Sequence, residues 1–183
     1  RVLFRSVFPG FQVLDAAGPM AAFDLAGRNA AHPYDIQIMA AEGGAIASSA
    51  GVAFDARPLG DGPYDTIMVA GGGMQQDMDG TAAIVAWLRT EAPRARRTAS
   101  VSTGAFLLAE AGLLDGRRAT THWGVTHLFC RRYPQVSLDA DRIYIRDGSI
   151  WTSGGATAGI DLTLALIVSS MDYARTPTSC NMT

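Results

Sequence analysis

Residues 99–106 read Ala-Ser-Val-Ser-Thr-Gly-Ala-Phe, a pattern that predicts a buried strand turning sharply into a helix. Ser102 stands at the turn, and the small residues Ser100 and Gly104 flank it where a tight turn leaves no room for bulk. The sequence therefore predicts a nucleophile elbow, with Ser102 held at the rim of a sheet in a strained backbone conformation. The helix that follows would direct unpaired N–H groups toward that rim, which favours an oxyanion or a carboxylate there.

Strand and helix patterns alternate outward from this turn. Strands are predicted at 2–8, 34–40, 65–70, 98–101 and 119–122, β-like segments within 46–57, and helices at 81–92, 103–111, 123–132 and 157–168. We expect Pro19 to open the first helix and Gly112 to cap the helix after the elbow. Asp147-Gly148 is predicted to turn a hairpin over 142–153.

The repeated strand–helix units predict a flavodoxin-like α/β sandwich, a mostly parallel sheet with helices on both faces and sites at the carboxyl ends of its strands. The short apolar stretch 65–70 agrees with this, because a parallel strand is covered on both faces. The apolar periodicity stops at Val168. We therefore expect one domain over 1–168, and a tail or the beginning of a continuation over 169–183.

Composition limits the classes of function. The chain has 183 residues, 48% of them hydrophobic, which is enough for one domain with a sizeable core. Its formal net charge is −2, so the overall charge does not attract it to nucleic acid or to an acidic membrane surface. The two cysteines, Cys130 and Cys180, lack the spacing of metal ligands, and a reducing cytoplasm is expected. Arg5 and Ser6 interrupt the first apolar run and 162–168 is too short to span a bilayer, so neither a signal peptide nor a membrane segment is expected.

Three loops follow predicted strands, at Gly10, at Gly71-Gly72-Gly73 and at the elbow itself. The carboxyl ends of parallel strands meet at one edge of a sheet, so we expect these loops to converge. The N–H groups of Gly71, Gly72 and Thr103 would then form an anion-binding site for a ligand oxygen. A simple tight turn is the alternative explanation for the triple glycine.

The segments around the elbow resemble a known family. Residues 102–106 and 109–123 (Ala-Glu-Ala-Gly-Leu-Leu-Asp-Gly-Arg-Arg-Ala-Thr-Thr-His-Trp) are similar to the ThiJ/PfpI superfamily, whose fold resembles class I glutamine amidotransferases. Shorter matches occur at 14–19, 132–134, 146–148 and 151–161. The chain most resembles the amidotransferase-like sensor domain at the N-terminus of AraC-type transcriptional regulators, and this similarity covers residues 2–168.

Two departures from the superfamily concern Ser102 and Thr103. The superfamily places its cysteine nucleophile where Ser102 stands, and its peptidases place a histidine at the following position. A serine hydroxyl is almost never ionised at neutral pH, so catalysis would need a base within hydrogen-bond reach. The order Ser102, Asp115, His122 mimics that of a hydrolase triad. A working triad, a non-catalytic ligand contact and a serine substituted for a cysteine are the three interpretations of Ser102.

Asp15 lies on the predicted loop after the first strand. In isonitrile hydratases the matching aspartate faces the nucleophile, which makes Asp15 a candidate catalytic residue by resemblance. The alternative is that Asp15 caps a helix that begins at Pro19, since aspartate is a good acceptor there. Both roles can hold at once.

The three histidines are His32, His122 and His127. His122 is a candidate ligand-binding residue because it ends a predicted strand near the elbow, although a buried structural histidine explains the same position. His127 and Cys130 are three apart on one predicted helix, and with no further ligand nearby no metal site is expected.

The resemblance implies a ligand-sensing domain that binds a small metabolite at the elbow, needs no cofactor, forms a homodimer and is not catalytic. DNA binding would belong to a C-terminal helix-turn-helix domain that this chain does not contain. One alternative is a stand-alone enzyme of the isonitrile hydratase or amidohydrolase kind. A second alternative is a serine hydrolase, which Ser102 would serve as nucleophile.

Overall fold

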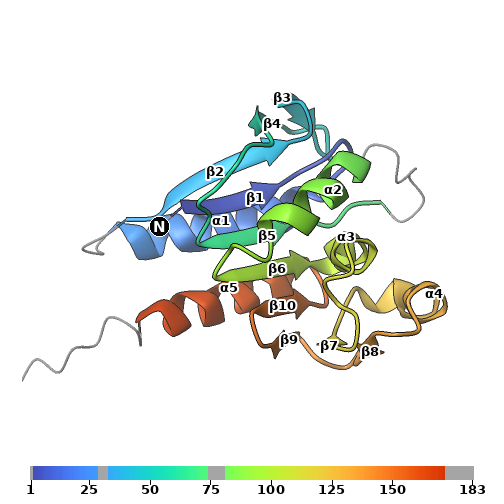
Figure 1. Cartoon of the computed structure of the whole chain (residues 1–183). Coiled ribbons are helices and arrows are strands. Elements are labelled where there is room, and N and C mark those ends of the chain that lie inside the picture. Colours follow the sequence, from blue (N-terminus) through green and yellow to red (C-terminus); the bar gives the residue numbers. More distant parts are fainter. Residues whose placement is uncertain (1, 29–32, 74–80, 172–183) are drawn as a thin grey trace, which may run out of the picture.

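Eight strands form one sheet in the computed structural model of the chain, which describes residues 2–28, 33–73 and 81–171 (Figure 1). The strand order is β3-β4-β2-β1-β5-β6-β10-β9. The strands are β1 (Val2–Ser6), β2 (Asp35–Ala40), β3 (Gly44–Ala47), β4 (Ala53–Pro58), β5 (Thr66–Val69), β6 (Arg97–Val101), β9 (Tyr144–Asp147) and β10 (Ile150–Ser153). A separate pair consists of β7 (Arg118–Ala119) and β8 (Ser137–Leu138).

The six inner strands of the sheet run parallel to one another. Only the outermost strands, β3 and β9, run antiparallel to the strand beside them. This arrangement confirms the predicted mostly parallel sheet. It also brings the carboxyl ends of β1, β5 and β6 to one edge, because these three strands are adjacent.

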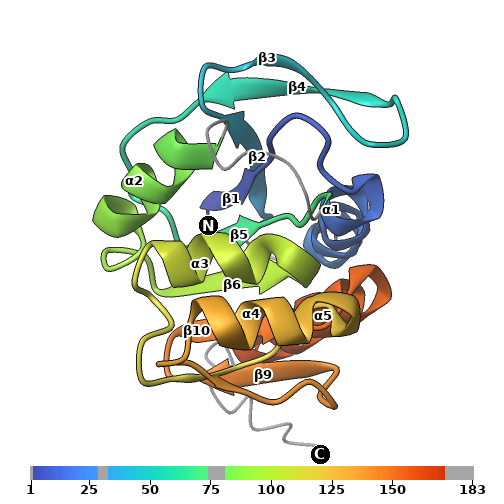
Figure 2. The same cartoon turned by 90° about the vertical axis from the view of Figure 1, so that its right-hand side faces the viewer.

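Helices cover both faces of the sheet, which confirms the flavodoxin-like α/β sandwich (Figure 2). One face carries α1 and α5 side by side, and the other carries α2, α3 and α4. The helices are α1 (Val13–Gly27), α2 (Ala82–Glu91), α3 (Ala105–Glu110), α4 (Thr126–Arg132) and α5 (Ala156–Met171), with 3-10 turns η2 (Ser102–Gly104) and η3 (Trp123–Val125).

Strand β5 shows why the sheet is buried on both faces. Ile67 and Val69 belong to the core under α2 and α3, whereas Met68 belongs to the core under α1 and α5. Successive side chains of a strand point to opposite faces, so a continuous apolar run fits this position. The prediction for 65–70 is confirmed.

The first helix begins earlier than predicted, at Val13, and Pro19 lies inside it. Backbone hydrogen bonds fix this start: the N–H of Gln12 donates to the Gly71 carbonyl at 2.8 Å, and the N–H of Asp15 donates to the Gln12 carbonyl at 3.0 Å. Proline has no N–H, so the helix lacks one internal bond at Pro19. The predicted capping of a helix at Pro19 by Asp15 is therefore wrong.

Two other predicted boundaries also move. The strand predicted at 119–122 is only β7, because the N–H of Thr120 donates to the Thr152 hydroxyl at 2.8 Å instead of continuing a ladder. The last helix continues past Val168 to Met171. Side-chain hydrogen bonds at Ser169 and Ser170 hold its end where the apolar pattern has stopped.

Two predicted turns are confirmed. Gly112 has a φ of +78° after α3, and the N–H of Leu113 donates to the Leu108 carbonyl at 2.9 Å, as in a Schellman cap. The hairpin joins β9 to β10 in antiparallel register, with Gly148 at a φ of +61° in its turn. Only glycine adopts such a φ without strain.

Candidate functional site

The elbow predicted at Ser102 is present. Ser102 follows β6 directly, opens η2 and has a φ of +55°, the only positive φ of a non-glycine residue in the described part of the chain. Such a conformation is strained for a residue with a β-carbon, and it persists only where the surroundings enforce it. Ser102 is 9% exposed, so little more than the edge of its side chain reaches solvent.

Gly104 shows how the elbow is enforced. A β-carbon on Gly104 would lie 2.5 Å from the carbonyl oxygen of Val69 and 3.0 Å from that of Ala70. The turn of the elbow therefore presses against the end of β5, and only glycine fits this close approach. Ser100, the small residue on the other side, is completely buried.

The loops after β1 and β5 meet the elbow as predicted. Phe11 forms an isolated antiparallel bridge with Gly72, and the Gly71 carbonyl accepts the N–H of Gln12. The Gly71 N–H donates to the Asp15 carboxylate at 3.0 Å. The start of α1 is in this way tied to the loop that follows β5.

Asp15 and Thr103 enclose Gly71. A β-carbon at Gly71 would lie 2.6 Å from Oδ2 of Asp15 and 2.7 Å from Oγ1 of Thr103. Asp15 is 1% exposed, so its carboxylate is held inside the protein beside the residue that follows Ser102. Glycine is needed at position 71 because any side chain would displace both groups.

The amide of Gly72 is engaged within the chain. Its N–H donates to the Thr103 hydroxyl at 2.8 Å, and the same hydroxyl donates to the Gly72 carbonyl at 2.9 Å. With the Gly71 N–H engaged by Asp15, both glycine amides are occupied within the chain. Gly71 and Gly72 thus brace the loop against the elbow, and the anion-binding site expected from their N–H groups and that of Thr103 stays a prediction.

Thr121 is a residue of the elbow that the sequence did not single out. Its hydroxyl donates to the carbonyl of Ser102 at 2.9 Å, and Thr121 is 1% exposed. This bond holds the strained residue from the side of the segment after β7. The only signal in the sequence was the position of Thr121 beside His122.

His122 contacts the residues that directly follow it in the chain. Its Nδ1 accepts the N–H of Gly124 at 3.2 Å, and its ring stacks on Trp123 with centroids 5.3 Å apart. His122 also lies near Gly155 at the start of α5, where a β-carbon would be 3.9 Å from its Cδ2.

Asp115, the remaining residue of the Ser102, Asp115, His122 order, lies at the opposite end of α3 from Ser102. Asp115 pairs with Gln135 at 3.0 Å, beyond the carboxyl end of α3, whereas Ser102 lies just before its amino end. His127 and Cys130 are exposed on α4, and His32 lies outside the described residues. Within residues 2–28, 33–73 and 81–171, no three His, Cys, Asp or Glu side chains gather as metal ligands.

The fold and the elbow define a family. The chain belongs to the DJ-1/PfpI family, whose model matches residues 1–169. It is 37% identical over 165 residues to the HTH-type transcriptional regulator CdhR of Pseudomonas aeruginosa, an alignment that covers 88% of this chain and 48% of that protein. The chain thus spans about half the length of this regulator.

Two further comparisons concern an enzyme and a solved structure. An isonitrile hydratase of Pseudomonas putida is 40% identical over 104 residues, 56% of this chain and 43% of that enzyme. The crystal structure of an AraC family transcriptional regulator from Pseudomonas putida has the same fold, with a TM-score of 0.78 over 94% of this chain and 98% of that one, at 15% identity. The sequence-based assignment to the ThiJ/PfpI superfamily is confirmed, and an HTH-type transcriptional regulator is among its relatives.

Proposed function

We propose that this chain is the ligand-sensing domain of an AraC-type transcriptional regulator and that it binds a small metabolite at the elbow without turnover. The observation that carries the proposal is the 37% identity to a transcriptional regulator over 88% of the chain. The site supports it, because Ser102 carries a hydroxyl where the family has a thiol, and among the described residues His122 and Asp115 are engaged with Gly124 and Gln135. A strained, buried elbow of this kind is suited to holding a ligand.

The nature of the ligand follows from the charges around the elbow. The N–H of Thr103 belongs to the first turn of η2, and first-turn N–H groups have no acceptor within their own helix, which favours a ligand oxygen. The buried carboxylate of Asp15 opposes a fully anionic ligand. A neutral amide, or an amino-bearing metabolite whose cation faces Asp15, satisfies both constraints better than a phosphate-rich nucleotide.

Binding can be tested by thermal unfolding of the chain with small amides, amino acids, betaine-like compounds and nucleotides. We expect compounds of the first three classes to raise the unfolding temperature of the wild type and to lose this effect in Thr103→Val, which removes the hydroxyl that braces the loop. Thr90→Val on α2 is the matched control, since the Thr90 hydroxyl bonds only within its helix, to the Trp87 carbonyl at 2.8 Å. Stabilisation by nucleotides alone contradicts this description of the site.

The assembly proposed with this function is a homodimer in the cytoplasm that reaches DNA through a helix-turn-helix domain outside this chain. A two-fold DNA site is read by two copies of a binding module, so a dimer of the sensor domain would supply the matching symmetry. No helix within the described residues is long and apolar enough to cross a membrane. Light scattering that gives a monomer mass at micromolar concentrations contradicts the dimer.

An isonitrile hydratase-like or amidohydrolase activity is the second candidate. It is favoured by the 40% identity to an isonitrile hydratase and by the closeness of Asp15 to the elbow through Gly71. We expect no amidase, peptidase or isonitrile-hydrating turnover by the wild type, because the thiol is missing. The assay compares the wild type with Ser102→Cys and Ser102→Ala, and turnover by the wild type that disappears in Ser102→Ala establishes the enzyme instead. Labelling of Ser102 by a fluorophosphonate would indicate a serine hydrolase.

A further inference from the structure

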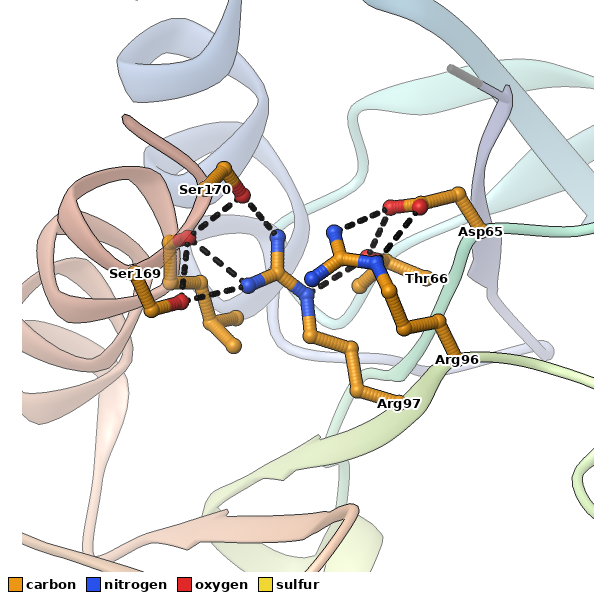
Figure 3. Close-up of polar contacts among 7 residues, drawn as sticks. Asp65, Thr66, Arg96, Arg97, Ser169 and Ser170 are labelled. Carbon is orange, nitrogen blue, oxygen red and sulfur yellow. Dashed lines mark hydrogen bonds and ion pairs between the residues drawn. The ribbon is translucent and has the colours of Figure 1, made fainter. Parts of the chain in front are cut away.

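The guanidinium of Arg97 is buried at the beginning of β6, at the end of the strand opposite to Ser102. Arg97 is 3% exposed. Its Nε donates to the Thr66 hydroxyl at 2.8 Å, within the sheet. Its two remaining nitrogens donate to the carboxyl-terminal part of α5, to the Leu166 carbonyl and the Ser169 hydroxyl at 2.7 Å and to the Ser170 hydroxyl at 2.8 Å (Figure 3).

This arrangement needs arginine. Burying a cation is costly unless its donors are all directed at acceptors, and the planar fork of a guanidinium can meet acceptors on two elements at once. The carboxyl end of α5 supplies them, and its dipole favours a positive charge there. The neighbouring Arg96 differs in exposure and in the kind of partner. Its side chain is 43% exposed, and it pairs with the Asp65 carboxylate at 2.7 Å.

The same helix is also fitted to the other end of β6. Gly159 of α5 lies against Val101, where a β-carbon would be only 2.6 Å from Cγ1 of the valine. Val101 directly precedes Ser102. Between the two ends, Leu162 and Leu166 pack in one core with Ala99. Arg97, Ala99 and Val101 alternate along one face of β6, so the strand contacts α5 from the elbow to the guanidinium.

We propose that Arg97 is a positioning residue that locks the carboxyl end of α5 to β6, so that a change at Ser102 is carried along the strand to the end of the helix. This inference rests on the proposed function, in which the rest of a regulator would follow α5. Strand β6 and helix α5 would move as one packed unit, with the elbow at one end and the carboxyl end of α5 at the other. The occupied elbow would thus alter the direction in which the chain leaves α5.

Amide hydrogen exchange of the 183-residue chain tests this coupling without ligand or DNA. The variants are Arg97→Met, which removes the fork, and Ser170→Ala, which removes one acceptor on the helix and leaves the sheet intact. Arg96→Met is the matched control. Exchange of the amides at 82–91 in α2 serves as the reference for overall stability, because α2 and α5 pack on opposite faces of the sheet.

We expect exchange at 166–171 to accelerate about ten-fold or more in Arg97→Met and less in Ser170→Ala, since hydrogen bonds to a charged group are strong. Relative to α2, exchange at 102–105 should rise in the same variants, because coupling between two sites is reciprocal. In Arg96→Met, exchange at 166–171 and at 102–105 should change no more than exchange in α2 does.

Faster exchange at 166–171 with an unchanged elbow would overturn the proposal and reduce Arg97 to a local anchor of the helix. Unchanged exchange at both segments would overturn it as well. If Arg97→Met does not fold, Ser170→Ala alone decides between these outcomes. A failed ligand screen leaves this result untouched, so the failure of the proposed function and the failure of the coupling are distinguishable.

Discussion

The two ends of β6 are held in opposite ways. At the carboxyl end, Ser102 is forced into a positive φ by close backbone contacts and neutral hydroxyls. At the amino end, Arg97 lies in a relaxed strand and satisfies a buried charge with four hydrogen bonds. The difference indicates a division of tasks along one strand, because strain is tolerated at sites of function while dense hydrogen bonding secures the scaffold around them.

The largest effect on stability is expected from Gly104→Ala, which disrupts the elbow at the carboxyl end of β6. Its new β-carbon would meet the Val69 carbonyl at 2.5 Å, so we expect a loss of about 3 kcal/mol in the free energy of unfolding. Gly60→Ala is the control, since the nearest atoms to its β-carbon lie at 3.8 Å. Urea unfolding measures both, and an equal effect of the two substitutions would contradict the close approach.

The second largest effect on stability is expected from Arg97→Met, which removes the buried hydrogen bonds at the amino end of β6. The acceptors on α5 and at Thr66 lose a charged donor, and we expect a loss of about 2 kcal/mol in the free energy of unfolding. Arg96→Met should cost at most about 1 kcal/mol, because its ion pair with Asp65 is partly exposed. Equal losses for the two neighbouring arginines would show that burial does not distinguish them.

Ser102→Gly is expected to stabilise the chain. Glycine accepts a φ of +55° without strain, so the free energy of unfolding should increase by about 1 kcal/mol. For a domain of this size the unfolding temperature should rise by roughly 2–4 °C. Calorimetry measures the shift, with Ser149→Gly in the hairpin as a control at a position of ordinary φ. A destabilised Ser102→Gly would mean that the elbow is relaxed.

The smallest effect concerns pH at the amino end of β6. Burial raises the pKa of Asp65, but hydrogen bonds from Arg96 and Thr66, together with the charges of Arg96 and Arg97, outweigh it and hold the pKa below its usual value. Asp65 therefore contributes stability above the pKa of the unfolded chain, and this contribution is lost as the pH falls through the lower pKa of the folded state. Between about pH 5 and pH 2, the wild type should lose up to about 1 kcal/mol more than Asp65→Asn. If the free energies of unfolding of the two proteins fall equally over this pH range, Asp65 does not make this pH-dependent contribution.

The elbow could be predicted because its determinants are local. Ser100, Ser102 and Gly104 lie within five residues, and the apolar strand before them and the helix after them are visible in the same stretch. The fold class followed from the alternation of strands and helices, and the meeting of the loops followed from parallel strand order. Each of these inferences depends on neighbours in the sequence or on a general rule of sheets.

The rest depends on partners far along the chain. The start of α1 is set by Gln12 bonding to Gly71, which a sequence pattern around Pro19 does not reveal. The occupation of the Gly72 amide depends on the rotamer of Thr103. Arg97 reads as one of several surface arginines until its acceptors on α5, some seventy positions later, are known. Such long-range pairs carry no periodic signal.

The positive φ of Ser102 has a consequence for the evolution of this position. Since the backbone there favours glycine, every side chain that occupies it makes the chain harder to fold. Mutation without selection for ligand or chemistry would drift toward glycine, and stability alone would reward the change. The proposed ligand site would give the side chain at this elbow a use that offsets the strain, and the residue type found at this position in each descendant would record what its site is required to do.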